Sequence, residues 1–319
     1  MFHGGTNWGF QNGADWGSAL TPVITSYDYG APLDESGRTN DIYDAIKQTI
    51  SSFVKTDELP ALPAQPPLIE VAPISLSPSA TLFESLPEAF GATAPVNMEA
   101  LGQAVGFTLY RHTIQSAVDG ILKTGDAPRD RILVYVNQSR VGIIDNIYEY
   151  PASVKLSLQQ NDVLDILVEN QGRVNYGPRI PDQRKGIVGN VTVGETVLSD
   201  WEMFPLSLEQ PPSAQQNVQV TDYPQAGPVF YSGSFDVDTV GDTFLELPGW
   251  IKGVVWVNGV NLGRYWIIGP QQTLYLPGCW LEEKNNSITV LALEPSAGQG
   301  SVQGITTRNW RSNPDPDLP

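Results

Sequence analysis

The first 35 residues concentrate aromatic side chains of the types that bind polyhydroxylated rings. Tyr27 and Tyr29 stand at positions i and i+2, so an extended backbone would point both rings to one side. A tyrosine offers an apolar ring face and a hydroxyl that donates or accepts a hydrogen bond. Trp8 and Trp16 could serve as flat stacking platforms, but packing is the favoured interpretation for both. For Tyr27 and Tyr29 too, the residues alone favour core packing under the loop, and sugar binding is the alternative.

Four carboxylates share this opening stretch, namely Asp15, Asp28, Asp34 and Glu35. Hydrolysis of a glycoside with retention requires two carboxyl groups about 5–5.5 Å apart, one as nucleophile and one as acid and base. Asp28 lies between the two tyrosines, and we expect it to support the loop by hydrogen bonding. We expect Asp34 and Glu35 to serve a turn or the approach to a following helix.

Metal and cofactor chemistry finds no support in the sequence. His3, His112 and Cys279 are the only histidines and cysteine, and they cannot assemble a zinc site of the His/Cys type. His3 is expected to be packed in an apolar start, and His112 to be structural. A phosphate-binding loop, a dinucleotide fingerprint and a G-x-S-x-G nucleophile motif are all absent from the sequence. We therefore predict no cofactor and no metal.

The charge balance limits the classes of partner. Lys and Arg total 18 against 35 Asp and Glu, which gives a formal net charge of −17. Such a surface repels nucleic-acid phosphates and anionic lipid, whereas a neutral sugar is unaffected by the field. The sequence has no apolar stretch of about 18 residues, the length needed to span a bilayer. We predict neither a nucleic-acid nor a membrane partner.

The elements around the candidate residues read as one strand, a long loop and one helix, within residues 1–57. Isoleucines and a phenylalanine recur at helical spacing between Asp41 and Lys55. Thr39 or Asn40 can cap this helix, whose first turn is acidic. A strand, loop and helix form one unit of an α/β barrel. A parallel strand is stable only with neighbouring strands and with both faces covered, so this segment is expected to be poorly stable by itself.

The remainder predicts a mainly β fold with two sandwich modules. Residues 58–89 are predicted to be a proline-rich linker and a bridging strand, because proline fixes φ and donates no hydrogen bond. Short β-branched and aromatic runs between turn residues then indicate antiparallel sandwiches. The predicted parts are module 1 at 90–208, a linker at 209–225, module 2 at 226–311 and a frayed tail at 312–319.

An internal repeat supports two related modules. ILVYVNQSRVG (132–142) aligns without gaps on GVVWVNGVNLG (253–263), 121 positions later, and Tyr110 and Tyr231 keep the same offset. In the second copy Asn258 and Gly259 stand between β runs, the pair favoured by a type I′ hairpin turn, which needs positive φ twice.

Several long motifs carry a resemblance to a known family. They are GGTNWGF (4–10), TSYDYGAPLDE (25–35), LVENQGRVNYG (167–177), DWEMFPL (200–206), LPGW (247–250) and WVNGVNLGRYW (256–266). In this order the chain resembles the C-terminal portion of family 35 glycoside hydrolases, the lysosomal-type acid β-galactosidases. The resemblance implies the last strand–loop–helix unit of a (β/α)8 barrel, followed by two jelly-roll or galactose-binding-like sandwiches.

The resemblance also implies a function. Family members are retaining enzymes that hydrolyse terminal non-reducing β-D-galactose, and Tyr27 and Tyr29 match residues that line the galactose subsite. Both catalytic glutamates of the family lie on earlier barrel strands, so we predict no catalytic residue here and no activity of this chain alone. Expected partners are galactosides and the missing N-terminal barrel portion. The family suggests a secreted, lysosomal or vacuolar location.

A non-enzymatic protein, either carbohydrate-binding or bracing, remains the alternative. The polar loop 169–177 is expected to dock against the barrel, with Arg173 and Asn175 as interdomain contacts. A cluster near the end of the second module is likewise expected to brace the barrel rather than bind sugar: Trp250, Trp256, Arg264, Tyr265 and Trp266.

Overall fold

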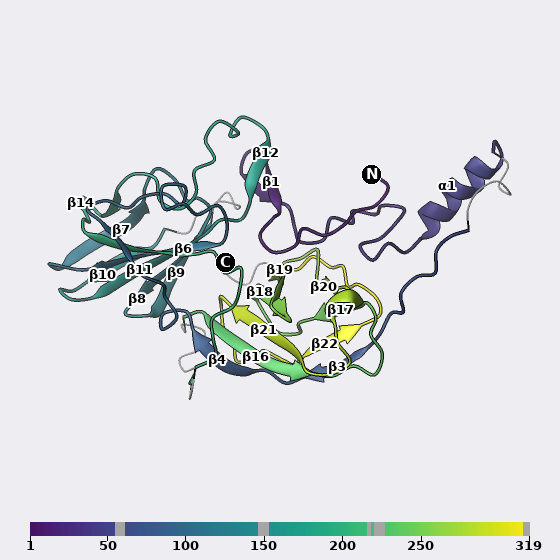
Figure 1. Ribbon diagram of the computed structural model, residues 1–319. Coiled ribbons are helices and arrows are strands. Elements are labelled where there is room, and N and C mark those ends of the chain that lie inside the picture. Colours follow the sequence, from purple (N-terminus) through teal and green to yellow (C-terminus); the bar gives the residue numbers. More distant parts are fainter. Residues whose placement is uncertain (55–60, 146–152, 216–217, 220–226, 315–319) are drawn as a thin grey trace.

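The computed structural model describes residues 1–54, 61–145, 153–215, 218–219 and 227–314. Two β bodies lie side by side, and the N-terminal segment runs across one end of both (Figure 1). The single α-helix of the described residues projects away from these bodies. The fold is mainly β, as predicted.

The first sandwich consists of two sheets that enclose an apolar core. One sheet has six strands in the order β5-β15-β6-β11-β8-β9, and the other has four in the order β10-β7-β13-β14. Neighbouring strands are antiparallel throughout. The strands are β5 (Phe90–Ala92), β6 (Phe107–Thr113), β7 (Val118–Thr124), β8 (Arg131–Val136), β9 (Ser139–Asp145), β10 (Lys155–Leu158), β11 (Val163–Glu169), β13 (Val191–Val193), β14 (Thr196–Val197) and β15 (Trp201–Leu206).

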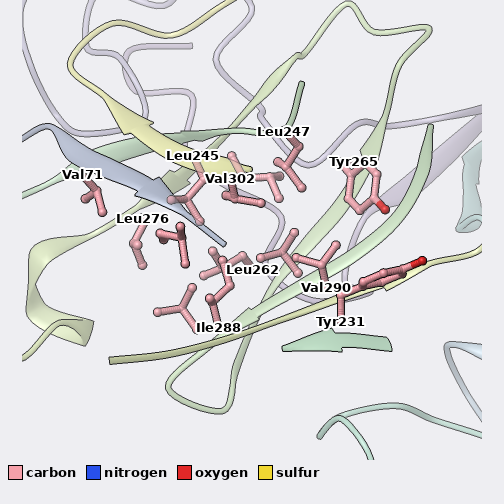
Figure 2. Packing of buried hydrophobic residues seen from close by; sticks show 14 of the residues in the cluster. Val71, Tyr231, Leu245, Leu247, Leu262, Tyr265, Leu276, Ile288, Val290 and Val302 are labelled. Carbon is pink, nitrogen blue, oxygen red and sulfur yellow. The ribbon is translucent and has the colours of Figure 1, made fainter. Parts of the chain in front are cut away.

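The second sandwich has sheets of five and four strands, in the orders β19-β18-β21-β16-β4 and β20-β17-β22-β3. A 3-10 turn, Gly278–Trp280, follows β20. The inward-facing side chains of the second sandwich form a compact core that includes Leu245, Leu262 and Val290 (Figure 2). The strands are β3 (Val71–Ile74), β4 (Ser77–Thr81), β16 (Val229–Phe235), β17 (Thr243–Glu246), β18 (Lys252–Val257), β19 (Val260–Trp266), β20 (Thr273–Leu276), β21 (Asn286–Ala292) and β22 (Val302–Ile305).

Two details differ from the sequence expectation. The segment 58–89 supplies two strands rather than one bridging strand, since β3 pairs with β22 and β4 pairs with β16. Residues that precede the first sandwich therefore complete the second. At the other end, Asn313 of the predicted frayed tail is held by two hydrogen bonds to the backbone of Ile267 and Ile268, at 2.7 and 3.0 Å. The tail residues 315–319 lie outside the described residues.

The internal repeat is confirmed strand by strand. The order β6-β11-β8-β9 in the first sandwich matches β16-β21-β18-β19 in the second. Each hairpin carries one bulge, between Val134 and Tyr135 in one copy and between Val255 and Trp256 in the other. Asn258 has the positive φ of 50° that the type I′ turn requires, and the turn of the first copy is left-handed as well. The bulge and turn thus recur at the same offset as the sequence.

The N-terminal segment forms only part of the expected barrel unit. A small sheet joins β1 (Gly13–Trp16), β2 (Leu20–Pro22) and β12 (Arg173–Tyr176), and β1 runs parallel to β12. The predicted strand at the very start is wrong: His3 makes one isolated bridge to Leu33. The absence of a strand around His3 is expected on physical grounds, because a parallel strand needs neighbouring strands to be stable.

The helix α1 (Asp41–Ser51) is formed as expected, within narrower limits. Asn40 caps it by accepting hydrogen bonds from the amides of residues 42 and 43, at 3.0 and 3.2 Å. No residue of α1 is buried, and its apolar side chains Ile42, Ile46 and Ile50 are exposed. Amphipathic helices normally gain their stability from packing of the apolar face, and here that face is uncovered among the described residues.

Candidate functional site

The loop that carries the two tyrosines is fastened to the second sandwich. The Thr25 hydroxyl donates to the carbonyl of Arg264 at 3.0 Å and accepts from its amide at 3.1 Å. The next amide, of Ser26, donates to the side chain of Gln271 at 2.6 Å. Gly263 permits this approach, because a Cβ there would lie 2.6 Å from the Thr25 methyl group. The backbone before Tyr27 is therefore positioned by β19 and the loop after it.

Tyr27 and Tyr29 lie at the surface and contact each other. Their rings meet edge to face, with centroids 5.1 Å apart and planes at 85°. Tyr27 is 40% exposed and Tyr29 is 54% exposed, so both can reach a ligand. The extended geometry assumed from the sequence is wrong at Tyr29, whose φ is +44° and which forms a turn with Gly30. The rings meet through this turn rather than through strand alternation.

Asp28 supports the loop from beneath. It is fully buried, forms an ion pair with Arg308, and accepts the amide of Gly30 at 3.0 Å. Asp34 likewise holds a turn by accepting from the Ser36 hydroxyl at 2.7 Å. The structural roles expected for these carboxylates agree with the geometry.

Glu35 is the most perturbed carboxyl group of this segment. It is 7% exposed and accepts a hydrogen bond from the Thr6 hydroxyl at 2.8 Å. Burial raises the pKa of Glu35 to about 7, with a smaller contribution from the Asp28 charge, against the lowering effect of hydrogen bonds from Ser26 and Thr6 and of the Arg308 charge. Asp28 and Glu35 thus lie under the loop, away from solvent. Their burial leaves no surface on which a substrate could meet them.

The other aromatic and histidine candidates have structural surroundings. Trp8 contacts Tyr275 and Trp280 and packs against the core of the second sandwich. Trp16 lies under the guanidinium of Arg179 at 4.8 Å. His112 is buried against a tryptophan, as expected for a structural residue. His3 is exposed, so the expectation of a packed histidine is wrong.

A buried ionic cluster joins the two sandwiches behind the loop. Glu169, at the end of β11, is fully buried and pairs with Arg264 at 2.9 Å and with Lys252 at 3.2 Å. Lys252 also lies 3.9 Å from the ring centre of Trp266. Arg264 continues to the N-terminal segment by donating to the side chain of Asn12. One carboxylate therefore ties both sandwiches and the front segment together.

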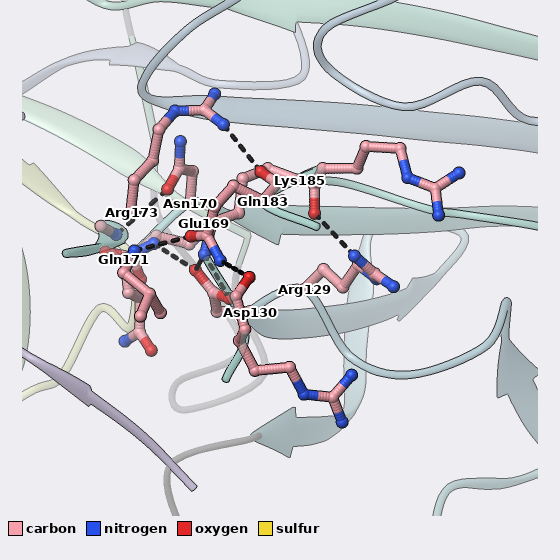
Figure 3. A network of polar contacts seen from close by, with 12 residues as sticks. Arg129, Asp130, Glu169, Asn170, Gln171, Arg173, Gln183 and Lys185 are labelled. Atoms are coloured by element: carbon pink, nitrogen blue, oxygen red, sulfur yellow. Dashed lines mark hydrogen bonds and ion pairs between the residues drawn. The ribbon is translucent and has the colours of Figure 1, made fainter. Parts of the chain in front are cut away.

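The loop after Glu169 is only partly as predicted. Asp130, which lies directly before β8, holds this loop. It pairs with Lys185 at 2.8 Å and accepts a hydrogen bond from the amide of Gln171 at 2.8 Å (Figure 3). The guanidinium of Arg173 binds carbonyls of Gln183 and Ala104 within the first sandwich, each at 2.7 Å. Only the backbone at Arg173 reaches the front segment, through β12. The predicted interdomain contact at Arg173 is therefore made by its backbone, which pairs with Gly13, and not by its guanidinium.

The bracing of a barrel expected of the tryptophan-rich cluster stays a prediction. Trp250, Trp256 and Tyr265 are core residues, and Arg264 bridges the parts. Glu169, which pairs with Arg264, and Lys252, which pairs with the same carboxylate, were missed as site residues. A lysine in the otherwise apolar run IKGVVWV (251–257) was the available signal, because a lysine is almost never buried unless it is paired.

Metal-binding and membrane-spanning features are absent from the part of the chain that the structure describes. It contains no group of three or more His, Cys, Asp or Glu side chains that could hold an ion. No helix in the described ranges has the length and apolar character to cross a bilayer.

Comparison with known proteins matches each part of this architecture. Residues 1–53 match the model of glycosyl hydrolases family 35. Residues 95–207, which span most of the first sandwich, match the first all-β domain of β-galactosidase, and residues 228–286 match its galactose-binding domain. These matches define the class of protein: a β-galactosidase-type assembly of β-sandwich modules.

Individual relatives give the same result. A β-galactosidase of Xanthomonas manihotis is 39% identical over 281 residues, which cover 86% of this chain and 46% of the relative. The human β-galactosidase-1-like protein 2 is 40% identical and the mouse β-galactosidase-1-like protein 39% identical, over 91% and 98% of this chain and 46% and 51% of those proteins. The chain spans about half the length of the curated relatives it matches. It belongs to glycosyl hydrolase family 35.

Proposed function

We propose that this chain forms one part of a retaining β-galactosidase that removes terminal non-reducing β-D-galactose. In this proposal Tyr27 and Tyr29 line the galactose subsite, one wall of which is the loop 25–31. The observation that carries the proposal is the exposed edge-to-face tyrosine pair on a loop that the second sandwich fastens. Rings held in this way can present an apolar face to sugar C–H groups and hydroxyls to sugar oxygens.

The catalytic carboxyl pair is proposed to come from a barrel portion, in the same polypeptide or in a partner chain. Asp28 is engaged with Arg308 beneath the loop, and Glu35 is buried beside Thr6, so neither is placed to attack an anomeric carbon. The uncovered apolar face of α1 supports a barrel partner, since a barrel helix packs its apolar side on strands. Residues 1–319 alone are therefore expected to be inactive.

A second candidate is a non-enzymatic bracing role, which the buried Glu169 cluster favours. Three buried or half-buried ionic side chains bridge the two sandwiches and the front segment, an arrangement suited to holding parts in fixed relation. This role and the enzymatic one are compatible if the sandwiches hold the loop for a barrel-bearing form of the protein.

A chromogenic β-galactoside tests the proposal. Residues 1–319 should show no turnover, while a form that includes a barrel should be active. In that form Tyr29→Phe should lower kcat/KM about tenfold, because a lost hydrogen bond to substrate costs roughly 1–1.5 kcal/mol. Tyr176→Phe changes an exposed tyrosine of β12, outside the loop 25–31, and serves as the control. Turnover by residues 1–319 would refute the origin of the carboxyl pair, and an unchanged kcat/KM for both Tyr27→Phe and Tyr29→Phe would refute the subsite.

A further inference from the structure

The backbone that leads into Tyr27 is paired with the start of the chain. Residues 5–7 run antiparallel to residues 25–27, with backbone hydrogen bonds of 2.8 and 3.0 Å at the two ends of the paired segment. In this short ladder Thr6 lies opposite Ser26. The amide of Tyr27 itself donates the second of these hydrogen bonds, so the position of its ring depends on the ladder.

Glu35 connects the two sides of this ladder through its carboxyl group. The Thr6 hydroxyl donates to Oε1 of Glu35 at 2.8 Å, and the Ser26 hydroxyl forms a second hydrogen bond with the same carboxyl group. Glu35 is 7% exposed and Ser26 is fully buried, so these contacts lie away from solvent. One side chain from outside the ladder thus holds together the pair that directly precedes Tyr27.

Two buried carboxyl groups share one cation at this place. Asp28, from the tyrosine loop, is fully buried and pairs with Arg308 of the C-terminal segment, whose charge also acts on Glu35. From the start of the chain, Nε2 of His3 lies 3.4 Å from the carbonyl oxygen of Glu35. An ionised Glu35 would place a second negative charge beside Asp28, with no ion-pair partner of its own among the described residues.

We propose that Glu35 is a positioning residue that holds the tyrosine loop in place only in its protonated form. A neutral carboxyl group tolerates burial between Thr6 and Ser26, whereas an unpaired buried charge is far more costly. When Glu35 loses its proton to solvent, its side chain moves toward water and the Thr6–Ser26 pair separates. Tyr27 and Tyr29 then lose their edge-to-face geometry.

The pH range of this change follows from the surroundings of Glu35. Burial raises its pKa to about 7, and the charge of Asp28 adds to this effect. The loop should therefore be held below about pH 7 and released as the pH rises through this value. Weaker binding of a galactoside above pH 7 would be the consequence for catalysis. That consequence rests on the proposed function, whereas the movement of the loop does not.

Nuclear magnetic resonance spectra of residues 1–319, recorded between pH 5 and pH 8.5, test the proposal. The ring signals of Tyr27 and Tyr29 are assigned by their disappearance in Tyr27→Phe and Tyr29→Phe. Each ring shifts the signals of the other while they meet edge to face, so a change in their geometry is visible. Tyrosine hydroxyls ordinarily ionise near pH 10, outside this range. Both sets of signals should shift together, with one midpoint near pH 7.

Three variants identify the group that titrates. Glu35→Gln keeps the shape of the side chain without an ionisable proton, so the ring signals should stay at their low-pH positions throughout the range. Thr6→Val removes a hydrogen bond that lowers the pKa of Glu35, and should move the midpoint to higher pH. Histidine ordinarily titrates in the same range, so His3→Gln is the control and should leave the transition unchanged.

The outcomes separate this inference from the proposed hydrolysis. Ring signals that do not move between pH 5 and pH 8.5 overturn it, and so does a transition that persists in Glu35→Gln or disappears in His3→Gln. If Glu35→Gln does not fold, the Thr6→Val variant decides, because an unchanged midpoint there overturns the proposal. No galactoside enters these measurements, so a chain without any hydrolytic role still shows the transition. A barrel-bearing form whose KM is constant across a visible transition would refute the tyrosine subsite and leave the role of Glu35 standing.

Discussion

Replacement of Glu169 by glutamine tests the ionic cluster that joins the parts of the molecule. Glu169 is fully buried, and it pairs with Lys252, which is 2% exposed, and with Arg264. Glutamine keeps the shape but removes the charge, so two cations remain in the interior without their carboxylate. Loss of one partner from a buried ion pair typically costs about 3–5 kcal/mol. We expect Glu169→Gln to lower the free energy of unfolding by about 3 kcal/mol, near the lower end because glutamine retains one acceptor oxygen.

The pH dependence of this loss has a defined sign. Burial alone would raise the pKa of Glu169, but the charges of Lys252, Arg264 and Arg131 outweigh burial and lower it. A carboxyl group with a lowered pKa in the folded state contributes stability that is present above its unfolded pKa and is lost as the pH falls through the folded value. The difference between Glu169→Gln and the unmodified chain should therefore be full at pH 7 and shrink below about pH 4.

Urea unfolding followed by tryptophan fluorescence measures the effect. Glu202→Gln, on the exposed side of β15, is the matched control and should change the free energy of unfolding by less than about 0.5 kcal/mol. A double-mutant cycle with Lys252→Met should give a combined loss smaller than the sum of the single losses, because the two groups interact directly. Strict additivity, or a Glu169→Gln loss below about 1 kcal/mol at pH 7, would contradict the assignment of a tightly coupled buried cluster.

Three further changes test local features. Burial raises the pKa of Glu35 to about 7, so the native state keeps a proton that the unfolded chain loses between about pH 4.5 and 7, and stability falls as the pH rises across this window; Glu35→Gln should remove that slope in thermal melts at pH 5 and pH 8. Asn40→Ala removes the cap of α1 and should destabilise the helix by about 1 kcal/mol, seen as faster amide hydrogen exchange in residues 41–51 with no change in β18. Asn258→Ala should lower the free energy of unfolding by about 1 kcal/mol more than Asn258→Gly, because φ there is +50° and glycine adopts this region without cost; equal losses would show that the lost side-chain bonds dominate.

Features that depend on residues close together in the sequence were predicted well. The capped helix depends on Asn40 and its neighbours, and the hairpin turn depends on Asn258 and Gly259. The repeat was visible because both copies keep the same spacing, and the structure gives them the same bulge. Each of these features is decided within about ten residues, where turn chemistry and periodicity act.

Features that depend on distant partners were missed. The burial of Asp28 depends on Arg308, and the fate of Lys252 depends on Glu169 in the other sandwich. No local pattern states which strands will bring such residues together. The geometry at Tyr29 was mistaken for a different reason: alternation assumes an extended chain, whereas the following glycine allows a turn with positive φ. The strand expected at the start failed because its stability would come from neighbours rather than from its own residues.

The contacts of the front segment suggest why two sandwiches accompany the tyrosine loop. On one side of Tyr27 the backbone is fixed by Arg264 and Gln271, and on the other side Asp28 is fixed by Arg308. All three partners belong to the C-terminal part of the chain, so the loop is clamped on both flanks by the second sandwich and the residues after it. The helix α1, by contrast, has no such partner among the described residues. The sandwich therefore sets the geometry of the loop independently of whatever covers the helix. A ligand that contacts these tyrosines meets a backbone that is already ordered, which reduces the entropic cost of binding.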